Sequence, residues 1–247
     1  WRDWSSDVCS SDLGKMHSTN KEVIHLAHLI GRTPNSVALR LVNFASVDPV
    51  LKARGIKGMD GGKKVVQPIW DEFFNNQEEL IFLSEEILAK KENSSIEGKF
   101  KELFWNIKEL KGEVKLREIK TRVNQNVFRQ IVMANYSGKC AISGIDLPEL
   151  LFASHIVPWA KNEQERLNPE NGICLSALYD KAFDKGLIGV NEQYQILLSE
   201  KIKKRKNKDF YGQYFASLEN KSLILPQKYL PRKEFIQYHL DMVFEKA

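Results

Sequence analysis

Four side chains between residues 155 and 184 are of types that together could support metal-assisted hydrolysis: His155, Asn171, Asp180 and Asp184. A neutral imidazole is a competent general base near neutral pH, because its reference pKa is about 6.5. The two aspartates are four residues apart, so a helix would place both carboxylates on one face. Oxygen donors of this kind suit Mg²⁺ or Mn²⁺. Hydrolysis of this kind needs an activated water, a metal that stabilises the developing negative charge, and correct placement of both.

Each of these residues also has a purely structural interpretation. A lone histidine in an apolar strand is more often a packed core residue than a base. Asn171 and Gly172 form a strong turn dipeptide, which explains an asparagine there without any chemistry. The two aspartates could be surface acids that pair with Lys181 and Lys185 on the same helix. Residue types alone leave these alternatives open.

Three separated motifs, in order along the chain, resemble the HNH (ββα-metal) endonuclease family. They are FRQIVMANYSGKCAISG, LLFASHIVPWA and RLNPENGICLSALYDKAFDKGLI. The resemblance covers about residues 119–200 and is closest to a bacterial restriction or defence branch, in which a helical region precedes the nuclease. The upstream string GRTPNSVALRLVNFASVDP also resembles that region. The resemblance implies metal-dependent cleavage of DNA, in which His155 deprotonates the water and Asn171 fixes the surrounding loop by hydrogen bonds.

The sequence departs from the family pattern at the positions that bind metal. Asp180 stands on the expected helix where many relatives carry histidine, and we expect it to be a metal ligand, with Asp184 as second ligand or support. Ser154 stands where the wider superfamily often has a metal-binding aspartate, so metal affinity could be low. Cys140 and Cys174 do not form the two Cys-x-x-Cys pairs of zinc-containing relatives, so we expect no structural zinc.

These departures keep other functions open. The protein could be a catalytically silent DNA-binding module, an RNA-directed nuclease or a nickase, and a homodimer is also left open. Basic residues that could contact phosphate flank the motifs or lie in the run KIKKRKNK at 201–208, although such a run is usually a solvated loop. The candidates are Arg122, Arg129, Lys161, Arg166, Lys203, Lys204 and Arg205.

The bulk composition permits a nucleic-acid partner without requiring one. The chain has 247 residues, a formal net charge of +5 and three cysteines. An odd, small number of cysteines argues against a disulfide framework and favours a reducing, cytoplasmic location. No apolar run is long enough for a membrane span, and no secretory signal opens the chain. Residues 1–13 show no apolar period and are interpreted as a non-native segment.

The order of elements predicts an α+β protein with a helical N-terminal region before a ββα-metal nuclease domain. We expect a helical region at 14–92, a linker and connecting helix at 93–118, and the nuclease domain at 119–247. Two helices around a turn at Gly31 outline a helix-turn-helix that could read DNA through Arg32 and Arg40, although an ordinary helical hairpin is the commoner explanation.

Local signals place the remaining elements. Thr33 followed by Pro34 predicts the start of the second helix. The apolar period predicts one helix over 70–92 and another over 121–136. Strands are expected at 140–142 and 150–156, followed by a helix over 176–185 that Gly186 closes.

Overall fold

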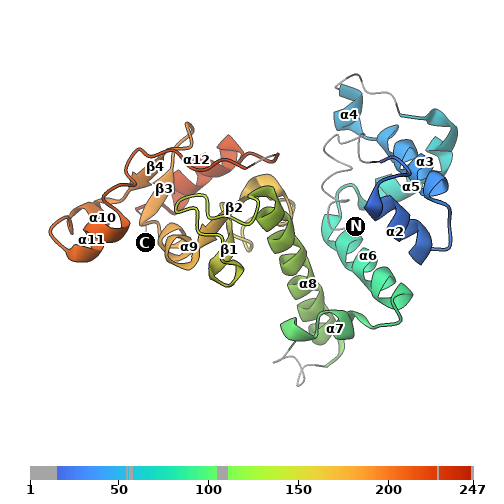
Figure 1. The fold of residues 1–247 in the computed structure, drawn as a ribbon, viewed down its shortest axis with the longest axis horizontal. Helices are drawn as coiled ribbons and strands as arrows, with labels where there is room; N and C mark the ends of the chain where they lie inside the picture. The colour runs from blue at the N-terminus through green and yellow to red at the C-terminus, as the bar shows by residue number, and fades with distance from the viewer. Residues whose placement is uncertain (1–15, 54, 56–57, 105–110, 227, 246–247) are drawn as a thin grey trace. The chain divides into compact units, whose positions relative to one another are not determined.

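The computed structural model describes residues 16–53, 55, 58–104, 111–226 and 228–245 of the chain. These residues form helices and short antiparallel strands, so the predicted α+β class is confirmed. The chain divides into two compact units between Val127 and Phe128 (Figure 1). The non-native segment proposed for residues 1–13 and part of the expected linker lie outside the described residues.

The division falls inside one continuous helix, α8 (Gly112–Asn135). The helix expected over 121–136 therefore begins earlier, at Gly112. The connecting helix expected before it is not formed at residues 101–103, which make a 3₁₀ turn, and its centre lies outside the described residues. The expected domain limits at 93 and 119 stay predictions.

Unit 1 is helical throughout its described part and precedes the strands. Its elements, besides α8 up to Val127, are α2 (Lys21–Leu29), α3 (Pro34–Ala45), α4 (Pro49–Ala53), α5 (Lys63–Phe73), α6 (Gln77–Lys91), α7 (Ile96–Lys99) and two 3₁₀ turns at Asp60–Gly62 and Lys101–Leu103.

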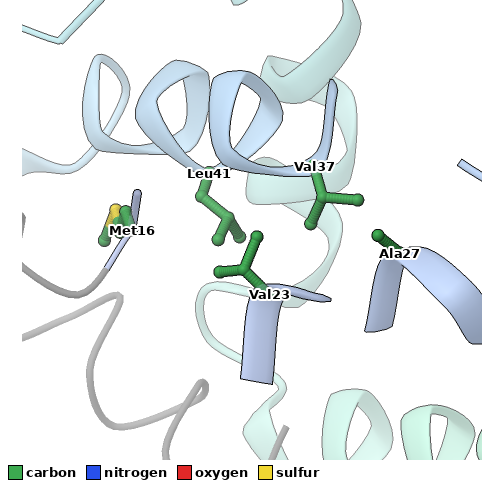
Figure 2. Close-up of a cluster of buried hydrophobic side chains, with 5 residues drawn as sticks. All are labelled: Met16, Val23, Ala27, Val37 and Leu41. Atoms are coloured by element: carbon green, nitrogen blue, oxygen red, sulfur yellow. The ribbon is translucent and has the colours of Figure 1, made fainter. Parts of the chain in front are cut away.

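Helices α2 and α3 form as their local signals predict. Gly31 adopts φ +65° in the turn between them, which a residue with a side chain rarely does. Thr33 Oγ1 accepts a hydrogen bond of 3.3 Å from the Ser36 amide, and Pro34 is the first helical residue. Apolar side chains of the two helices form a small core together with Met16, which precedes α2 (Figure 2). The helix residues of this core are Val23, Ala27, Val37 and Leu41.

The prediction of one helix over residues 70–92 is wrong. Helix α5 ends at Phe73, and α6 begins at Gln77. Asn76 has φ −132° and ψ 56°, outside the helical region. Two consecutive asparagines favour such a break, because their short polar side chains compete for backbone hydrogen bonds. The apolar period continues across the break and so conceals it.

Unit 2 contains all the described strands. Strand β1 (Leu151–His155) pairs antiparallel with β2 (Gly172–Ser176), and α9 (Ala177–Asp184) follows β2 directly and packs against both strands (Figure 1). The other elements are β3 (Ile188–Val190) paired with β4 (Ile196–Leu198), α10 (Glu200–Lys203), α11 (Asp209–Tyr214), α12 (Lys233–Met242) and 3₁₀ turns at Pro148–Leu150 and Pro169–Asn171.

The ββα order is present, but its first strand was assigned to the wrong residues. Residues 140–142 form a turn region, in which the Cys140 amide donates to the Ile145 carbonyl and the Ala141 amide donates to the Cys174 carbonyl. These are single hydrogen bonds rather than a ladder, because the chain reverses at Gly144, which has φ +75°.

The strand missed by the sequence analysis is β2. Its five residues, GICLS, are all buried and form the partner of β1. A short, fully buried strand lacks the alternation that marks a half-exposed one, so the sequence pattern predicts no element between Asn171 and the helix that begins at 176. As a result, His155 lies at the end of the first strand and not the second.

The end of α9 is determined by Gly186, as predicted. The Gly186 amide donates to the Phe183 carbonyl at 2.9 Å, and the Leu187 amide donates to the Ala182 carbonyl at 2.8 Å, which is a Schellman arrangement. Gly186 has φ +60°, and a Cβ there would overlap the Val243 carbonyl. Glycine is thus required both by backbone conformation and by close approach of the C-terminal segment.

Two further observations concern expectations from the sequence. Cys140 and Cys174 are buried free thiols. In the described part of the chain, no helix is both long enough and apolar enough to cross a membrane.

Candidate active site

The imidazole of His155 is held in one defined tautomer. His155 is the last residue of β1, and its Nε2 lies 2.9 Å from the backbone carbonyl oxygen of Arg166. A carbonyl oxygen can only accept, so Nε2 carries the proton of the neutral ring. Within the described residues no hydrogen bond to Nδ1 is formed. The neutral ring therefore presents the lone pair of Nδ1.

Two aromatic side chains fix the plane of this ring. Phe128 stacks on the imidazole with ring centroids 3.8 Å apart and an interplanar angle of 14°. Trp159 meets it edge-on, at 5.4 Å and 85°. Gly172, the β2 partner of His155, makes room for this stack, because a Cβ there would lie 2.9 Å from Phe128 Cζ and would overlap Val132.

Burial also determines the charge state of His155. Desolvation lowers the pKa of His155 below its usual value, and the hydrogen bond to the Arg166 carbonyl acts in the opposite direction with smaller effect. A histidine with a lowered pKa is neutral at neutral pH. His155 is thus in the form that can accept a proton from water.

The side chain of Asn171 closes the loop that follows His155. Its Oδ1 accepts from the Val157 amide at 2.8 Å, and its Nδ2 donates to the carbonyls of Val157 and Glu165 at 3.2 and 3.1 Å. The backbone adds a further bond, from the Ile156 amide to the Asn171 carbonyl at 2.9 Å. Asn171 is almost fully buried, at 1% exposure. It is therefore both a turn residue and the anchor of the loop.

The same loop is braced by Arg166, whose side chain points back into it. Arg166 Nε donates to the Trp159 carbonyl at 2.7 Å, and its guanidinium lies over the Trp159 ring, 5.3 Å from the centroid. A guanidinium nitrogen also pairs with Glu163 at 3.3 Å. The contact of Arg166 with DNA stays a prediction, and its contacts with Trp159 and Glu163 lie within the loop that holds His155.

Asp180 and Asp184 lie on α9, next to the two strands. Asp180 is half-buried and Asp184 is exposed. The pKa of Asp184 is raised, first by partial desolvation and then by the negative charge of Asp180, while Lys181 and Lys185 act against the rise. The two carboxylates are therefore close enough to repel each other. No ion pair joins either of them to a lysine within the described residues.

The metal ligands proposed from the sequence are the two carboxylates of α9. In the part of the chain that the structure describes, no group of three or more His, Cys, Asp or Glu side chains is gathered to hold a metal. Ser154 is buried, and its hydroxyl has no hydrogen-bond partner among those residues. Mg²⁺, by contrast, is commonly held by one or two carboxylates and completed by water and substrate phosphates. Asp180 and Asp184 fit that kind of site.

Several of the predicted phosphate-binding cations already have partners in the protein. Arg129 donates to the carbonyls of Leu151 and Pro148 at 2.6 and 3.1 Å, and so holds the start of β1. Arg122, in unit 1, donates to Glu118 at 2.8 Å and to the Leu103 carbonyl.

In the basic run after β4, Lys203 likewise has acidic partners in the protein, whereas Lys204 is exposed. Lys203 pairs with Glu219 and lies 3.9 Å from Glu200, and these partners raise the pKa of its ammonium group. Lys204 and Arg205 are exposed, as is Lys161 in the loop after His155. Arg205 Nη1 also donates to the Lys201 carbonyl at 2.6 Å, so Lys161 and Lys204 are the predicted cations that the described surface presents most openly.

Comparison with known families agrees with this geometry. Residues 140–191 match the model of a family described as HNH endonuclease. The matched segment contains β1, β2, α9 and β3, and so includes His155, Asn171 and both aspartates. No curated protein matches the chain. The resemblance to HNH endonucleases is confirmed for this segment, whereas the restriction and defence branch stays a prediction.

Proposed function

Because residues 140–191 match an HNH endonuclease model, we propose that this protein is a metal-dependent endonuclease that hydrolyses phosphodiester bonds in DNA. The observation that carries the proposal is the state of His155. Its ring is neutral, its Nε2 proton is engaged by the Arg166 carbonyl, and its Nδ1 lone pair is left to accept a proton.

In this mechanism, Nδ1 of His155 removes a proton from the water that attacks phosphorus. The imidazolium that forms keeps its hydrogen bond to the Arg166 carbonyl, which stabilises the positive charge. The stack on Phe128 keeps the ring plane constant through the step. Asn171 holds both ends of the loop, so the acceptor carbonyl does not drift away from the ring.

Asp180 would hold the divalent ion, Mg²⁺ or Mn²⁺, with Asp184 as second ligand or support. A bound ion of this kind stabilises the negative charge that develops on the phosphate and on the leaving oxygen. Burial, and after it the negative charge of Asp180, raises the pKa of Asp184. A nearby cation would relieve the repulsion between the two carboxylates.

DNA is the substrate that the family match favours, and bacterial restriction or defence is the role we propose for it. Lys161, Lys204 and Arg205 are exposed cations available to phosphates on unit 2. On unit 1, Arg32 and Arg40 are exposed at the α2–α3 pair, which supports a DNA-reading role for this helix pair.

Nicking of supercoiled plasmid across a series of Mg²⁺ and Mn²⁺ concentrations tests the base. His155→Ala should lower the rate by at least about 100-fold, because a positioned general base contributes on the order of 10²–10⁴-fold. Binding to DNA should persist and should weaken with added salt. His28→Ala, an exposed histidine on α2, is the matched control and should cut like the parent. Cutting by His155→Ala at the parent rate would remove His155 from the mechanism.

The metal assignment separates an endonuclease from a silent DNA-binding module. Asp180→Asn should abolish cutting at low metal concentration, whereas Asp180→His should restore part of it with Mn²⁺, Ni²⁺ or Zn²⁺. Asp146→Asn, an exposed loop carboxylate, is the control. If the parent protein binds DNA but does not cut it in the presence of any metal tested, the silent DNA-binding module is established. Relaxed product alone, or cleavage of RNA only, would establish a nickase or an RNA-directed nuclease.

A further inference from the structure

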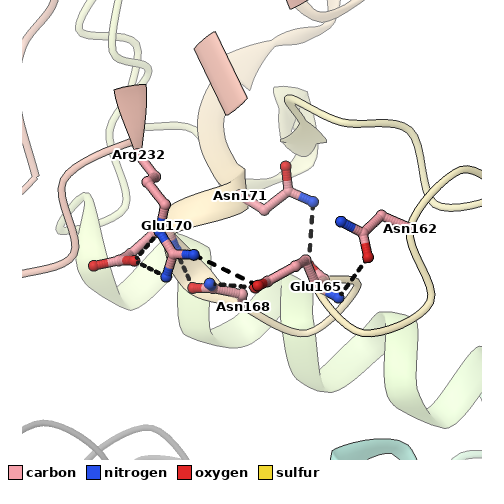
Figure 3. Close-up of polar contacts among 6 residues, drawn as sticks. All are labelled: Asn162, Glu165, Asn168, Glu170, Asn171 and Arg232. Carbon is pink, nitrogen blue, oxygen red and sulfur yellow. Dashed lines mark hydrogen bonds and ion pairs between the residues drawn. The ribbon is translucent and has the colours of Figure 1, made fainter. Parts of the chain in front are cut away.

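An ionic clamp joins the loop of the candidate base to the C-terminal helix (Figure 3). Arg232 stands immediately before α12, outside the segment that matches the HNH family. Its Nη2 and Nε donate to Glu170 Oε2 at 2.6 and 3.0 Å, and its Nη1 lies 3.5 Å from Glu165 Oε1. The Arg232 amide also donates to the Glu170 carbonyl at 3.1 Å. Arg232 therefore contacts the 3₁₀ turn before β2 through both its backbone and its side chain.

Glu165 connects this clamp to the atoms that hold His155. The Glu165 carboxylate accepts from Asn168 Nδ2 at 2.6 Å, and its carbonyl accepts from Asn171 Nδ2 at 3.1 Å. The next residue in the chain is Arg166, whose carbonyl receives the Nε2 proton of His155 at 2.9 Å. A continuous set of short contacts thus runs from Arg232 to the imidazole.

The other end of the clamp rests on a packed element. The Arg232 guanidinium lies over the ring of Phe235, 4.9 Å from its centroid. Phe235 and Ile236 are buried, and α12 packs on β3. The preceding residue, Pro231, accepts a hydrogen bond of 3.0 Å from the Tyr194 hydroxyl. Arg232 is therefore anchored next to a packed helix, so it can hold the loop in place rather than move with it.

We propose that Arg232 is a positioning residue for the base, which acts by holding the Glu165–Glu170 segment so that the Arg166 carbonyl stays under His155 Nε2. This inference rests on the proposed nuclease function for its kinetic consequence. The side chains of Arg232 and Glu170 are 40% and 35% exposed, so their ion pair contributes little to global stability. Placement of a catalytic group is far more sensitive, since a shift of about 1 Å can cost on the order of 100-fold in rate.

The kinetic test compares Arg232→Ala, Arg232→Lys and Glu170→Gln in the full chain, with Lys233→Ala as control. Arg232→Ala should lower kcat for plasmid nicking by roughly 10- to 100-fold and leave KM for DNA within about twofold. Arg232→Lys should recover only part of kcat, because an ammonium group lacks the planar fork that reaches two carboxylates. Lys233→Ala removes the same charge from the adjacent exposed position and should match the parent.

A spectroscopic test follows the imidazole directly and does not depend on cleavage. In ¹⁵N-labelled protein, the parent should show His155 as the Nε2–H tautomer, with His155→Ala used to assign its signals. Arg232→Ala and Glu170→Gln should show a mixture of tautomers or faster exchange of the Nε2 proton. The thermal midpoint of Arg232→Ala should fall by no more than about 5 °C.

The outcomes separate the two proposals. A parent that fails to nick refutes the nuclease function, and the tautomer of His155 in the variants still decides the role of Arg232. A parent that nicks, with unchanged kcat and unchanged His155 signals in Arg232→Ala, overturns the positioning role. Equal loss of kcat in Lys233→Ala would also overturn it. If Arg232→Ala does not fold, Arg232→Lys and Glu170→Gln provide the same test of the positioning role. These substitutions keep side chains of similar size at the Arg232–Glu170 pair.

Discussion

His239 of α12 is a buried histidine whose protonation should control the acid stability of unit 2. It is 2% exposed, it stacks on Phe183 with centroids 3.7 Å apart and an interplanar angle of 4°, and its Nε2 donates to the Phe183 carbonyl at 3.1 Å. Its Nδ1 is buried and has no hydrogen-bond partner among the described residues. Desolvation lowers its pKa from 6.5 to about 4, so the folded protein holds His239 neutral.

The pKa of His239 is 6.5 in the unfolded chain and about 4 in the folded protein, and this difference determines how much stability is lost in acid. Between pH 6.5 and pH 4 the unfolded chain binds a proton at His239 that the folded chain does not, so the free energy of unfolding falls as the pH falls. The loss amounts to about 2 kcal/mol at pH 5 and about 3 kcal/mol at pH 4. Above about pH 7 both states are neutral at this residue, and the contribution no longer changes.

Urea unfolding at a series of pH values measures this loss, followed through NMR signals of unit 2 so that unit 1 does not contribute. His239→Gln is the comparison, because a glutamine amide can donate to the Phe183 carbonyl but does not titrate. The variant should be less stable at pH 7.5, because it lacks the ring stack. Its deficit should shrink by about 2 kcal/mol on going to pH 5.

Other groups titrate in the same range, but they are common to both proteins. The lowered pKa of His155 has the same sign and cancels in the comparison. Equal losses of stability in the parent and in His239→Gln between pH 7 and pH 5 would refute the reasoning that His239 is held neutral by burial.

Two glycine substitutions give further expected outcomes. Gly172→Ala should press on Phe128, which stacks on the base; nicking should slow and unit 2 should lose about 1–3 kcal/mol by urea unfolding. Gly212→Ala, where a Cβ meets nothing within 4 Å, is its control and should leave both quantities close to the parent. Gly186→Ala should lower the thermal midpoint because of its φ of +60° and the overlap with Val243; an unchanged midpoint would contradict that geometry.

Features that depend on a residue and its immediate neighbours could be predicted from the sequence. The turn at Gly31, the cap at Thr33 with Pro34, and the end of α9 at Gly186 all form as expected. Backbone conformation and capping are decided within one turn of chain, so a single sequence contains the information. The break at Asn75–Asn76 is also local, but an apolar pattern that continued across it outweighed the asparagines.

The motifs placed His155, Asn171 and Asp180 in one candidate site, and the segment that contains them matches the HNH family. The strands around them were harder to assign. Residues 140–142 and β2 are both short and apolar, and only pairing with β1 distinguishes a strand from a buried turn. Pairing is a property of two segments distant in sequence, so composition does not reveal it.

The sequence by itself therefore determined which residues are available for the chemistry, and the tertiary structure decided what surrounds them. Arg129 and Arg166 are predicted phosphate contacts, and only the tertiary structure shows that each also donates to a backbone carbonyl of β1 or of the loop after His155. Phe128 stacks on His155, and Arg232 clamps the loop from a residue outside the matched segment. The amino-acid type of a residue is the same whether its side chain faces solvent or a neighbouring residue, so the sequence does not reveal the contact. Its partner is chosen only when distant segments pack together and a buried polar group must find its hydrogen bonds.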